Sequence, residues 1–220
     1  MDIPLFFTIM KIYITRHSKT IWNMEKRLQG RKDSPLTHEG IENAKALKTY
    51  LTNQSFDFIF SSPILRAYST AQIIFDSYDI IQDERLAEMN FGIFEGRKIT
   101  DILNTDFELY DQLWHDPARF TRIPEGESYD EVIERAQSFI EDLKKLPIDS
   151  HVMIVTHGMF FIVFLATLLG YEKKDFVLFN QKVVDGCSLT CLDFDGQKFL
   201  LEYYNECSYL PYVANESFSR

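Results

Sequence analysis

The sequence predicts an α/β protein, a three-layer sandwich with a mostly parallel central sheet and helices on both faces. Short apolar segments rich in β-branched residues alternate along the chain with longer segments of helical periodicity, and this alternation is typical of a parallel sheet covered by helices. A length of 220 residues and a hydrophobic share of 45% are sufficient for an extensive core. We therefore expect residues 1–220 to form a single domain.

The first third of the chain supplies two strand–helix units. Residues 9–15 have the apolar and β-branched content of a strand. Thr37 is the expected N-cap of a helix that ends near residue 52. A second strand over 56–60 precedes a helix over 63–76, which begins at a proline, a residue favoured in the first turn of a helix.

Residues 97–122 interrupt the alternation of strands and helices. They contain Trp114, Pro117 and several other aromatic residues without a clean strand pattern. We expect them to form a helical insertion over the active site, at the edge of the sheet where the strands end. Most of the aromatic side chains are expected in the core, and some of them are expected to face the pocket below.

The rest of the chain continues the α/β pattern and ends in a hairpin. An amphipathic helix is predicted over 127–146, a buried strand over 152–155 and an apolar helix over 159–169. The segments 188–194 and 199–204, joined by an Asp-Gly turn, are typical of a β-hairpin. The apolar stretch of the buried strand and its helix is about as long as a membrane span. A Thr-His-Gly sequence interrupts that stretch, so we interpret it as a buried strand followed by a buried helix.

The overall charge excludes some classes of partner. The chain carries 23 Lys and Arg against 33 Asp and Glu, a formal net charge of −10. Such an acidic protein is a poor general ligand for nucleic acid or an anionic membrane, so we expect neither as a partner. Cys187, Cys191 and Cys207 are odd in number and form no Cys-x-x-Cys pair, which favours reduced thiols and a cytoplasmic location. Composition leaves the oligomeric state open.

Polar residues follow the predicted strands at the points where each strand ends. The first strand ends in Arg-His-Ser (16–18), the second in Ser-Ser-Pro (61–63) and the third in Thr-His-Gly (156–158). Arg66 lies in the first helical turn after the second strand, and Glu88 precedes the insertion. Ligands bind at the carboxyl ends of the strands in open α/β sheets. We therefore expect two histidines, two arginines and a glutamate to meet at this edge.

This set of side chains suits a phosphoryl group. Guanidinium forks match the oxygens of a phosphate, and a neutral imidazole is a competent nucleophile toward phosphorus. The N-termini of the nearby helices add N–H donors and a favourable dipole. Nothing in the set resembles a metal cage, and His38-Glu39 lacks the second histidine of a zinc-protease helix. We therefore expect no metal and no cofactor.

Several short segments match a known family in order and spacing. They are RHSKTIWN (16–23), LQG (28–30), DSPLTHEG (33–40), SSPILRA (61–67), EMNFGIFEG (88–96) and VTHG (155–158). Together they resemble the histidine phosphatase superfamily, the phosphoglycerate mutase-like proteins, and within it the phosphatase branch. The resemblance extends from about residue 9 to residue 158, and residues 97–122 carry no matching motif.

The resemblance implies a role for each matching catalytic position. It implies that His17 attacks the phosphorus atom and becomes a phosphohistidine. Arg16, Arg66 and His157 are implied to hold the phosphoryl oxygens and to stabilise the transition state. Glu88 is implied to protonate the leaving alkoxide and then to deprotonate the water that hydrolyses the phosphoenzyme.

The resemblance also implies a lining for the substrate pocket. Asn23, Gln29 and Gly30 are expected to line the phosphate and substrate pocket. Ser18 is expected to contribute its N–H group there, although the family usually has glycine at this position. A glycine permits a close backbone approach and unusual dihedral angles. With serine at this position, the loop is the part of the site whose geometry is least fixed by the resemblance to the family.

The same site fits three functions. Mutases of this family usually have an arginine after the catalytic glutamate, and here that residue is Met89. We therefore expect a metal-independent phosphatase that acts on a small phosphorylated metabolite. A phosphoglycerate mutase-type transfer is the alternative, and a non-catalytic module that binds a phosphorylated ligand is a third. The physiological substrate is not specified by these residues.

Overall fold

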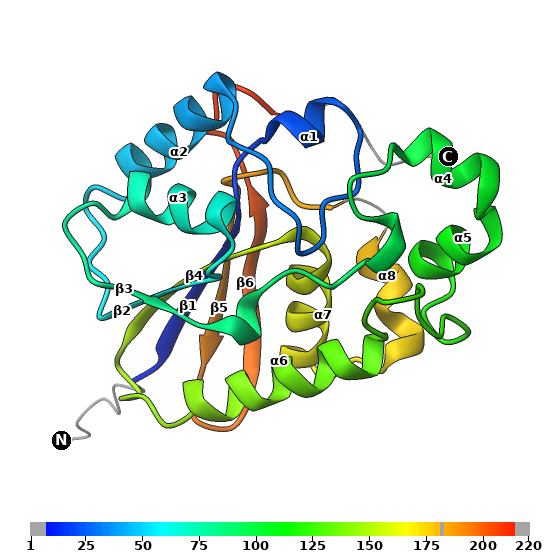
Figure 1. The fold of residues 1–220 in the computed structure, drawn as a ribbon. Coiled ribbons are helices and arrows are strands. Elements are labelled where there is room, and N and C mark those ends of the chain that lie inside the picture. Colours follow the sequence, from blue (N-terminus) through cyan, green and yellow to red (C-terminus); the bar gives the residue numbers. More distant parts are fainter. Residues whose placement is uncertain (1–7, 181–182, 214–220) are drawn as a thin grey trace, which may run out of the picture.

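The computed structural model describes residues 8–180 and 183–213. Its centre is a six-stranded sheet with the strand order β3-β2-β4-β1-β5-β6 (Figure 1). The strands are β1 (Met10–Arg16), β2 (Phe58–Ser61), β3 (Ile80–Gln82), β4 (His151–Thr156), β5 (Leu189–Phe194) and β6 (Phe199–Glu206). Strands β3, β2, β4 and β1 pair in parallel, and β5 and β6 add an antiparallel hairpin beside β1. The mostly parallel sheet is therefore confirmed.

Helices cover both faces of this sheet. They are α1 (Ile21–Met24), α2 (His38–Tyr50), α3 (Leu65–Ile74), α4 (Ile99–Thr105), α5 (Phe107–His115), α6 (Tyr129–Leu143), α7 (Gly158–Leu168) and α8 (Val177–Asn180), with short 3₁₀ turns at Glu84–Leu86, Gly92–Phe94 and Lys173–Phe176. Side chains of a strand alternate between its two faces. Accordingly, Tyr13 of β1 packs in the core with α2 and α3, whereas Ile12 and Ile14 pack in the core with α6 and α7. The three-layer sandwich is confirmed (Figure 1).

Side-chain caps fix where the two long surface helices begin. The Thr37 side chain accepts the Gly40 N–H at the start of α2. Ser128 and Glu131 form a capping box at the start of α6. Each such cap stabilises a helix by about 1 kcal/mol. The helix predicted to follow Thr37 is therefore confirmed, and the helix predicted over 127–146 is two to three residues shorter at each end.

The register of the parallel strands brings three chain segments together. Arg16 of β1 lies beside Thr156 of β4, and Ser61 of β2 lies beside Val155 of β4. The His17 N–H donates to the Thr156 carbonyl at 2.8 Å. The residues that follow β1, β2 and β4 consequently emerge side by side at the carboxyl edge of the sheet, as the sequence predicts.

The insertion forms α4 and α5 and packs beside α7 and α8 (Figure 1). Tyr110, Trp114 and Phe120 are buried in the core, as expected, whereas Phe107 is exposed. Asn180 of α8 donates its amide N–H to the Trp114 carbonyl at 3.0 Å. The insertion therefore extends the core on the α7 side of the sheet.

The apolar stretch after residue 151 is divided between β4 and α7, as predicted. Every residue of α7 except Thr167 is buried, which explains why this helix is apolar on all sides. Within the described ranges, no helix combines the length and apolar character needed to cross a membrane.

Candidate active site

His17 lies directly after β1 and is almost completely buried. Its Nδ1 atom is 2.8 Å from the Ser18 carbonyl oxygen. A carbonyl oxygen only accepts hydrogen bonds, so Nδ1 carries the ring proton. The Nε2 atom lies 3.2 Å from Arg66 Nε and accepts its N–H. These two contacts leave the Nε2 lone pair as the nucleophilic position of the ring.

The surroundings of His17 favour its neutral form. Burial, followed by the positive charges of Arg66 and Arg16, holds the pKa of His17 well below its usual range. Both causes act against a charged imidazolium. The ring is therefore available as a nucleophile at neutral pH and below.

Arg66 lies in the first turn of α3 and connects His17 to a neighbouring loop. Its Nη2 atom donates to the Gly30 carbonyl at 2.7 Å, and its Nη1 atom donates to the Lys32 carbonyl at 2.7 Å and to Asp33 Oδ1 at 3.1 Å. Burial lowers the pKa of Arg66, while the carboxylates of Glu88 and Asp33 oppose that shift. The guanidinium thus orients His17 Nε2 and the 30–33 loop together.

Gly30 has a conformation that requires glycine. Its φ angle is +57°, and a Cβ atom there would lie 2.0 Å from Glu95 Oε1. That Glu95 oxygen accepts the N–H groups of Arg31 at 2.8 Å and Phe91 at 3.0 Å. Glu95 therefore holds the loop in place, and any side chain at position 30 would displace it.

His157 follows β4 and faces His17. The ring centroids are 5.2 Å apart, with an interplanar angle of 55°. His157 Nε2 lies 2.7 Å from Ser62 Oγ, and Ser62 follows β2. Burial, followed by the charges of Arg66 and His17, holds the pKa of His157 well below its usual range. Its Nδ1 atom has no hydrogen-bond partner in residues 8–180 and 183–213, so this nitrogen is available to a ligand.

Glu88 is buried at the N-terminus of α7. Its Oε1 atom accepts the N–H groups of Met89 and Phe160, both at 2.9 Å, and its Oε2 atom accepts the Met159 N–H at 3.2 Å. Its charge is the largest influence that opposes the lowering of the Arg16 and Arg66 pKa values by burial. The carboxylate therefore lies close to both guanidinium groups.

Arg16 reaches from the end of β1 toward the C-terminal part of the chain. Its Nη1 atom donates to the Val184 carbonyl at 3.0 Å. Its buried Nε atom has no partner in the part of the chain that the structure describes. A Cβ atom at Gly158 would lie 2.8 Å from Val183 Cγ1 and 3.5 Å from Arg16 Nε. The absence of a side chain at Gly158 therefore makes room for Val183, while the Arg16 distance is an ordinary contact.

Ser18 directs its hydroxyl group away from the nucleophile. Its Oγ atom donates to the Gly40 carbonyl at 2.7 Å, and its N–H donates to Thr70 Oγ1 at 3.1 Å. Thr70 in turn donates to the Arg66 carbonyl at 2.7 Å. The backbone of Ser18 does not have a positive φ angle, so the serine fits without a glycine-like conformation. Its side chain and N–H position the loop by contacts within the protein.

The side chains of Asn23 and Gln29 both contact the Thr20 hydroxyl group. The Thr20 Oγ1 atom is 2.9 Å from Asn23 Oδ1 and 3.1 Å from Gln29 Oε1. Thr20 and Asn23 also form the capping box of α1. Both predicted pocket residues are thus held at the start of α1, next to the segment that carries His17.

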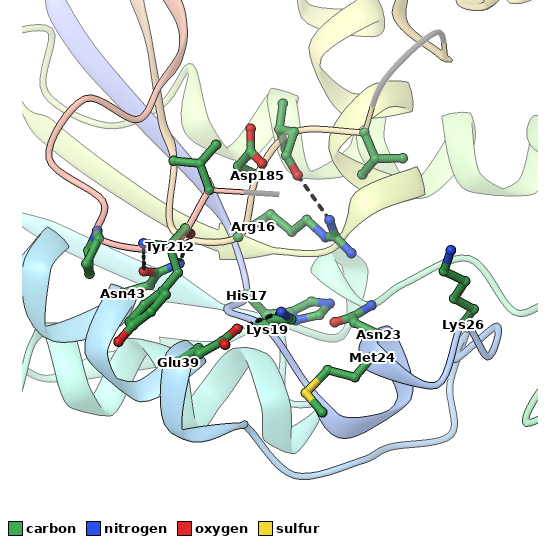
Figure 2. Close-up of a pocket in the computed structure, with 15 residues that line it drawn as sticks. Arg16, His17, Lys19, Asn23, Met24, Lys26, Glu39, Asn43, Asp185 and Tyr212 are labelled. Carbon is green, nitrogen blue, oxygen red and sulfur yellow. Dashed lines mark hydrogen bonds and ion pairs between the residues drawn. The ribbon is translucent and has the colours of Figure 1, made fainter. Parts of the chain in front are cut away.

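A cavity of about 750 Å³ opens onto Arg16, His17 and Asn23 (Figure 2). The other lining residues come from four chain segments, namely Lys19, Met24, Lys26, Glu39, Asn43, Val183, Val184, Asp185, Gly186, Pro211, Tyr212 and Val213. Arg66, Glu88 and His157 are buried and are not among the lining residues, but Arg66 and His157 lie next to His17, which marks the inner end of the cavity. None of the described lining residues belongs to 97–122. The insertion therefore contributes no described side chain to the lining of this cavity.

The sequence interpretation missed two kinds of residue at this site. The first is Ser62 and Thr70, which hold His157 and the loop of His17. Ser62 falls within a matched segment directly after a strand, and Thr70 lies one helical turn after Arg66, so both positions were available as signals. The second kind comprises the residues from the C-terminal segments 183–186 and 211–213, which carry no motif.

Only one group of described side chains has the geometry of a metal site, and it lies elsewhere. Cys191, Asp193 and Glu202 lie together on β5 and β6. The Lys11 ammonium group forms ion pairs with Asp193 at 2.9 Å and Glu202 at 2.8 Å. Lys11 therefore already neutralises the carboxylates of this group.

The fold and the site define the class of this protein: an α/β enzyme with a neutral, buried histidine at the centre of a cationic site. The chain belongs to the histidine phosphatase superfamily (branch 1), whose family model matches residues 12–207.

Similar proteins are known by sequence and by structure. The probable phosphoglycerate mutase GpmB of Yersinia pestis (strain Pestoides F) is 34% identical over 197 residues, which cover 87% of this chain and 88% of that protein. Bacillus stearothermophilus YhfR has a TM-score of 0.84 and 30% identity, covering 91% of this chain and 99% of its own. The α-ribazole phosphatase from Shigella flexneri has a TM-score of 0.80 and 26% identity, covering 93% of this chain and 100% of that chain. Mutases and phosphatases are both represented by name among these relatives.

Proposed function

We propose that this protein is a metal-independent phosphatase that hydrolyses small phosphomonoesters through a phosphohistidine on His17 Nε2. One observation carries the proposal. The Ser18 carbonyl holds the proton on Nδ1, and the Nε2 lone pair lies 3.2 Å from the Arg66 guanidinium at the inner end of the cavity. A neutral nucleophile beside fixed positive charge suits attack on an anionic phosphomonoester.

In the first step, His17 Nε2 forms a bond to phosphorus and the bond to the leaving oxygen breaks. Arg16 and Arg66 neutralise the charge on the phosphoryl oxygens, and His157 Nδ1 donates to one of them. Glu88 supplies the proton that the leaving alkoxide needs. Because Glu88 Oε1 accepts two N–H groups and Oε2 accepts one, Oε2 is the oxygen with room for that proton.

In the second step, water hydrolyses the phosphoenzyme. The Glu88 carboxylate takes a proton from the water, the water oxygen bonds to phosphorus, and the bond from phosphorus to His17 Nε2 breaks. The imidazole returns to its neutral form with the proton still on Nδ1. Every group in this cycle is a side chain of the chain itself, so no metal is required.

The residue after Glu88 favours a phosphatase over a mutase. Met89 is fully buried, so this position offers no cation to the carboxylate of a phosphoglycerate. A cavity of about 750 Å³ also has room for water beside a small substrate. A mutase is nevertheless the second candidate, because a relative at 34% identity carries that name. A module that only binds a phosphorylated ligand is the third, but it has no need of a buried proton donor such as Glu88.

Hydrolysis of p-nitrophenyl phosphate in the presence of EDTA tests the proposal. We expect turnover by the parent protein, its loss in His17→Ala, and its retention in His115→Ala, since His115 is exposed and pairs with Asp111 on the surface of α5. Supplying 3-phosphoglycerate and bisphosphoglycerate then separates the two reactions. Release of inorganic phosphate supports the phosphatase, and accumulation of the isomer supports the mutase. No turnover on a broad phosphomonoester panel supports the binding module.

The proposal extends to the partners and the location of the protein. A small phosphorylated metabolite is the ligand class, and the net charge of −10 disfavours nucleic acid and anionic membranes as partners. The thiols of Cys187 and Cys191, both buried, are consistent with the reducing environment of the cytoplasm.

A further inference from the structure

The C-terminal segment is fastened to the wall of the active-site cavity by one buried asparagine. Asn43 lies on α2 and is almost completely buried. Its Nδ2 atom donates to the Tyr212 carbonyl at 2.7 Å, and the Tyr212 N–H donates to Asn43 Oδ1 at 3.2 Å (Figure 2). A side-chain amide that satisfies both backbone groups of one residue fixes the position of that residue.

The residues just before Tyr212 are anchored as well. Tyr209 donates its hydroxyl to the Cys187 carbonyl at 2.7 Å and stacks on Tyr50 of α2, with ring centroids 4.2 Å apart. Leu210 is buried in the core between α2, α3 and the sheet. The segment therefore reaches the cavity from a fixed base, and Tyr212 is held at the rim against α2.

The outer part of the cavity presents apolar side chains. Met24 is 57% exposed, Tyr212 is 44% exposed and Val213 is 40% exposed, although all three line the cavity. Met24 of α1 and Tyr212 face the cavity from opposite sides (Figure 2). Large apolar groups gathered at the mouth of a cleft mark a surface that a ligand covers.

The charges of the outer part do not favour a second anionic group. Lys19 forms an ion pair with Glu39 at 2.6 Å, so these two lining residues neutralise each other. Lys26 and Asp185 add one further charge of each sign to the lining. The inner end, at Arg16 and His17, suits the phosphoryl group, whereas the outer part suits an uncharged and largely apolar moiety.

We propose that Met24, Tyr212 and Val213 form a subsite for the leaving alcohol, and that this subsite takes an aromatic or heteroaromatic phosphomonoester whose ring packs against Tyr212. Asn43 is the positioning residue for Tyr212. This inference rests on the proposed phosphatase function and adds the substrate class. The volume of about 750 Å³ lies within the range of sites for ligands of roughly drug size, well above the need of a three-carbon phosphate ester.

The test compares an aromatic and a small aliphatic substrate in the full chain. KM and kcat are measured for 1-naphthyl phosphate and glycerol 3-phosphate with the parent, Tyr212→Ala, Tyr212→Phe and Asn43→Asp. We expect Tyr212→Ala to raise KM for 1-naphthyl phosphate roughly 2- to 10-fold, as loss of a ring contact does, with kcat and the KM for glycerol 3-phosphate unchanged within twofold. Tyr212→Phe keeps the ring and is expected to match the parent. Asn43→Asp places a carboxylate against the Tyr212 carbonyl and is expected to act like Tyr212→Ala.

Tyr171→Ala is the matched control, because Tyr171 is also 44% exposed and does not line the cavity. An equal change for both substrates, or no change in Tyr212→Ala, overturns the subsite. Should Asn43→Asp fail to fold, the pair Tyr212→Ala and Tyr212→Phe still decides the question. A parent protein that hydrolyses neither substrate contradicts the proposed function instead, so the two failures are distinguishable.

Discussion

The inner and outer halves of the candidate active site are built in different ways. The inner half consists of His17, which lines the cavity, and of Arg66, Glu88 and His157, which are buried and do not line it. Each of the four is at most 6% exposed, and hydrogen bonds to backbone or buried hydroxyl groups fix all four side chains. The outer half consists of partly exposed side chains from α1, α2 and the C-terminal segment (Figure 2). Rigid buried groups are suited to the chemical step, which is the same for every substrate. Partly exposed groups are suited to binding the variable part of the substrate and so to determining specificity.

A partly buried ion pair extends the inner half beyond the reacting groups. Arg135 Nη1 donates to the carbonyls of Arg85 and Ala87, both at 2.7 Å, directly before Glu88. Its partner Glu127, at 3.1 Å, accepts the Asn90 N–H at 2.7 Å, just beyond Glu88. The pair thus holds the backbone on both sides of Glu88.

Replacement of Arg66 is expected to give the largest effect of the substitutions that test this comparison. Arg66→Lys keeps one positive charge but loses the contacts to His17 Nε2, Gly30 and Lys32 that a planar fork makes. We expect kcat/KM for p-nitrophenyl phosphate to fall by roughly 10²–10³-fold. Arg119→Lys, on an exposed side chain, is the control, and kinetics like those of the parent in Arg66→Lys would remove Arg66 from the phosphate-binding set.

The ion pair that frames Glu88 is expected to give the next effect. Arg135→Met keeps the apolar stem beside Phe160, over which the guanidinium lies at 4.7 Å, but releases the carbonyls before Glu88. We expect kcat to fall by roughly 10- to 100-fold through misplacement of the acid. The loss should be greater for an alkyl phosphate than for an aryl phosphate, because an alkoxide needs protonation more than a phenoxide does. Equal losses on both substrates would indicate a merely structural role.

The buried histidines of the inner half predict a pH-dependent stability. Burial and nearby cations lower the pKa of His17 and His157 in the folded state, whereas the unfolded chain protonates both near pH 6.5. Below that pH the unfolded state binds more protons, so the free energy of unfolding decreases by about 1.4 kcal/mol per pH unit for each histidine.

Urea unfolding between about pH 7 and about pH 5.5 measures this slope. We expect His157→Gln to show a shallower slope than the parent, because one of the two protons is no longer taken up on unfolding. An identical slope in both proteins contradicts the account of His157 as a neutral, desolvated ring.

The serine after the nucleophile is expected to give the smallest effect. Ser18→Gly removes the bond from Ser18 Oγ to the Gly40 carbonyl but retains the N–H bond to Thr70. We expect a loss of about 1 kcal/mol in the free energy of unfolding and a change in kcat of less than about threefold, which thermal unfolding and p-nitrophenyl phosphate hydrolysis measure. A large loss of kcat with unchanged stability would place the hydroxyl in the reaction.

The difference between the two halves also explains which residues of the site could be predicted from the sequence and which could not. The inner half and Arg16 lie at strand ends or in recognisable segments, so Arg16, His17, Arg66, Glu88 and His157 could be proposed as site residues from the sequence alone. The outer half depends on where a C-terminal segment crosses α2, and the Asn43–Tyr212 contact joins residues 169 positions apart. No local pattern encodes a contact of that range.

The elements show the same distinction between local and long-range signals. Capped helices and apolar strands were predicted to within a few residues. Strand β3 has only three residues, Ile80–Gln82, and forms by pairing with the edge of β2, so its short sequence carries too little periodicity to be recognised. Some aromatic residues of the insertion were expected to face the pocket, but none of the described lining residues comes from 97–122. The buried aromatic side chains of the insertion pack in the core near α8, because burial there removes their apolar surface from water.

The most direct measurement is to trap the phosphoenzyme during turnover of a phosphomonoester and to identify the phosphorylated atom. The quench must be alkaline, because a phosphohistidine is acid-labile. The account predicts one phosphoryl group per chain on Nε2 of His17, absent from His17→Ala and present in His115→Ala. A phosphoryl group on Nδ1, on His157 or on Ser18, or phosphate release from a fully active His17→Ala, would contradict it.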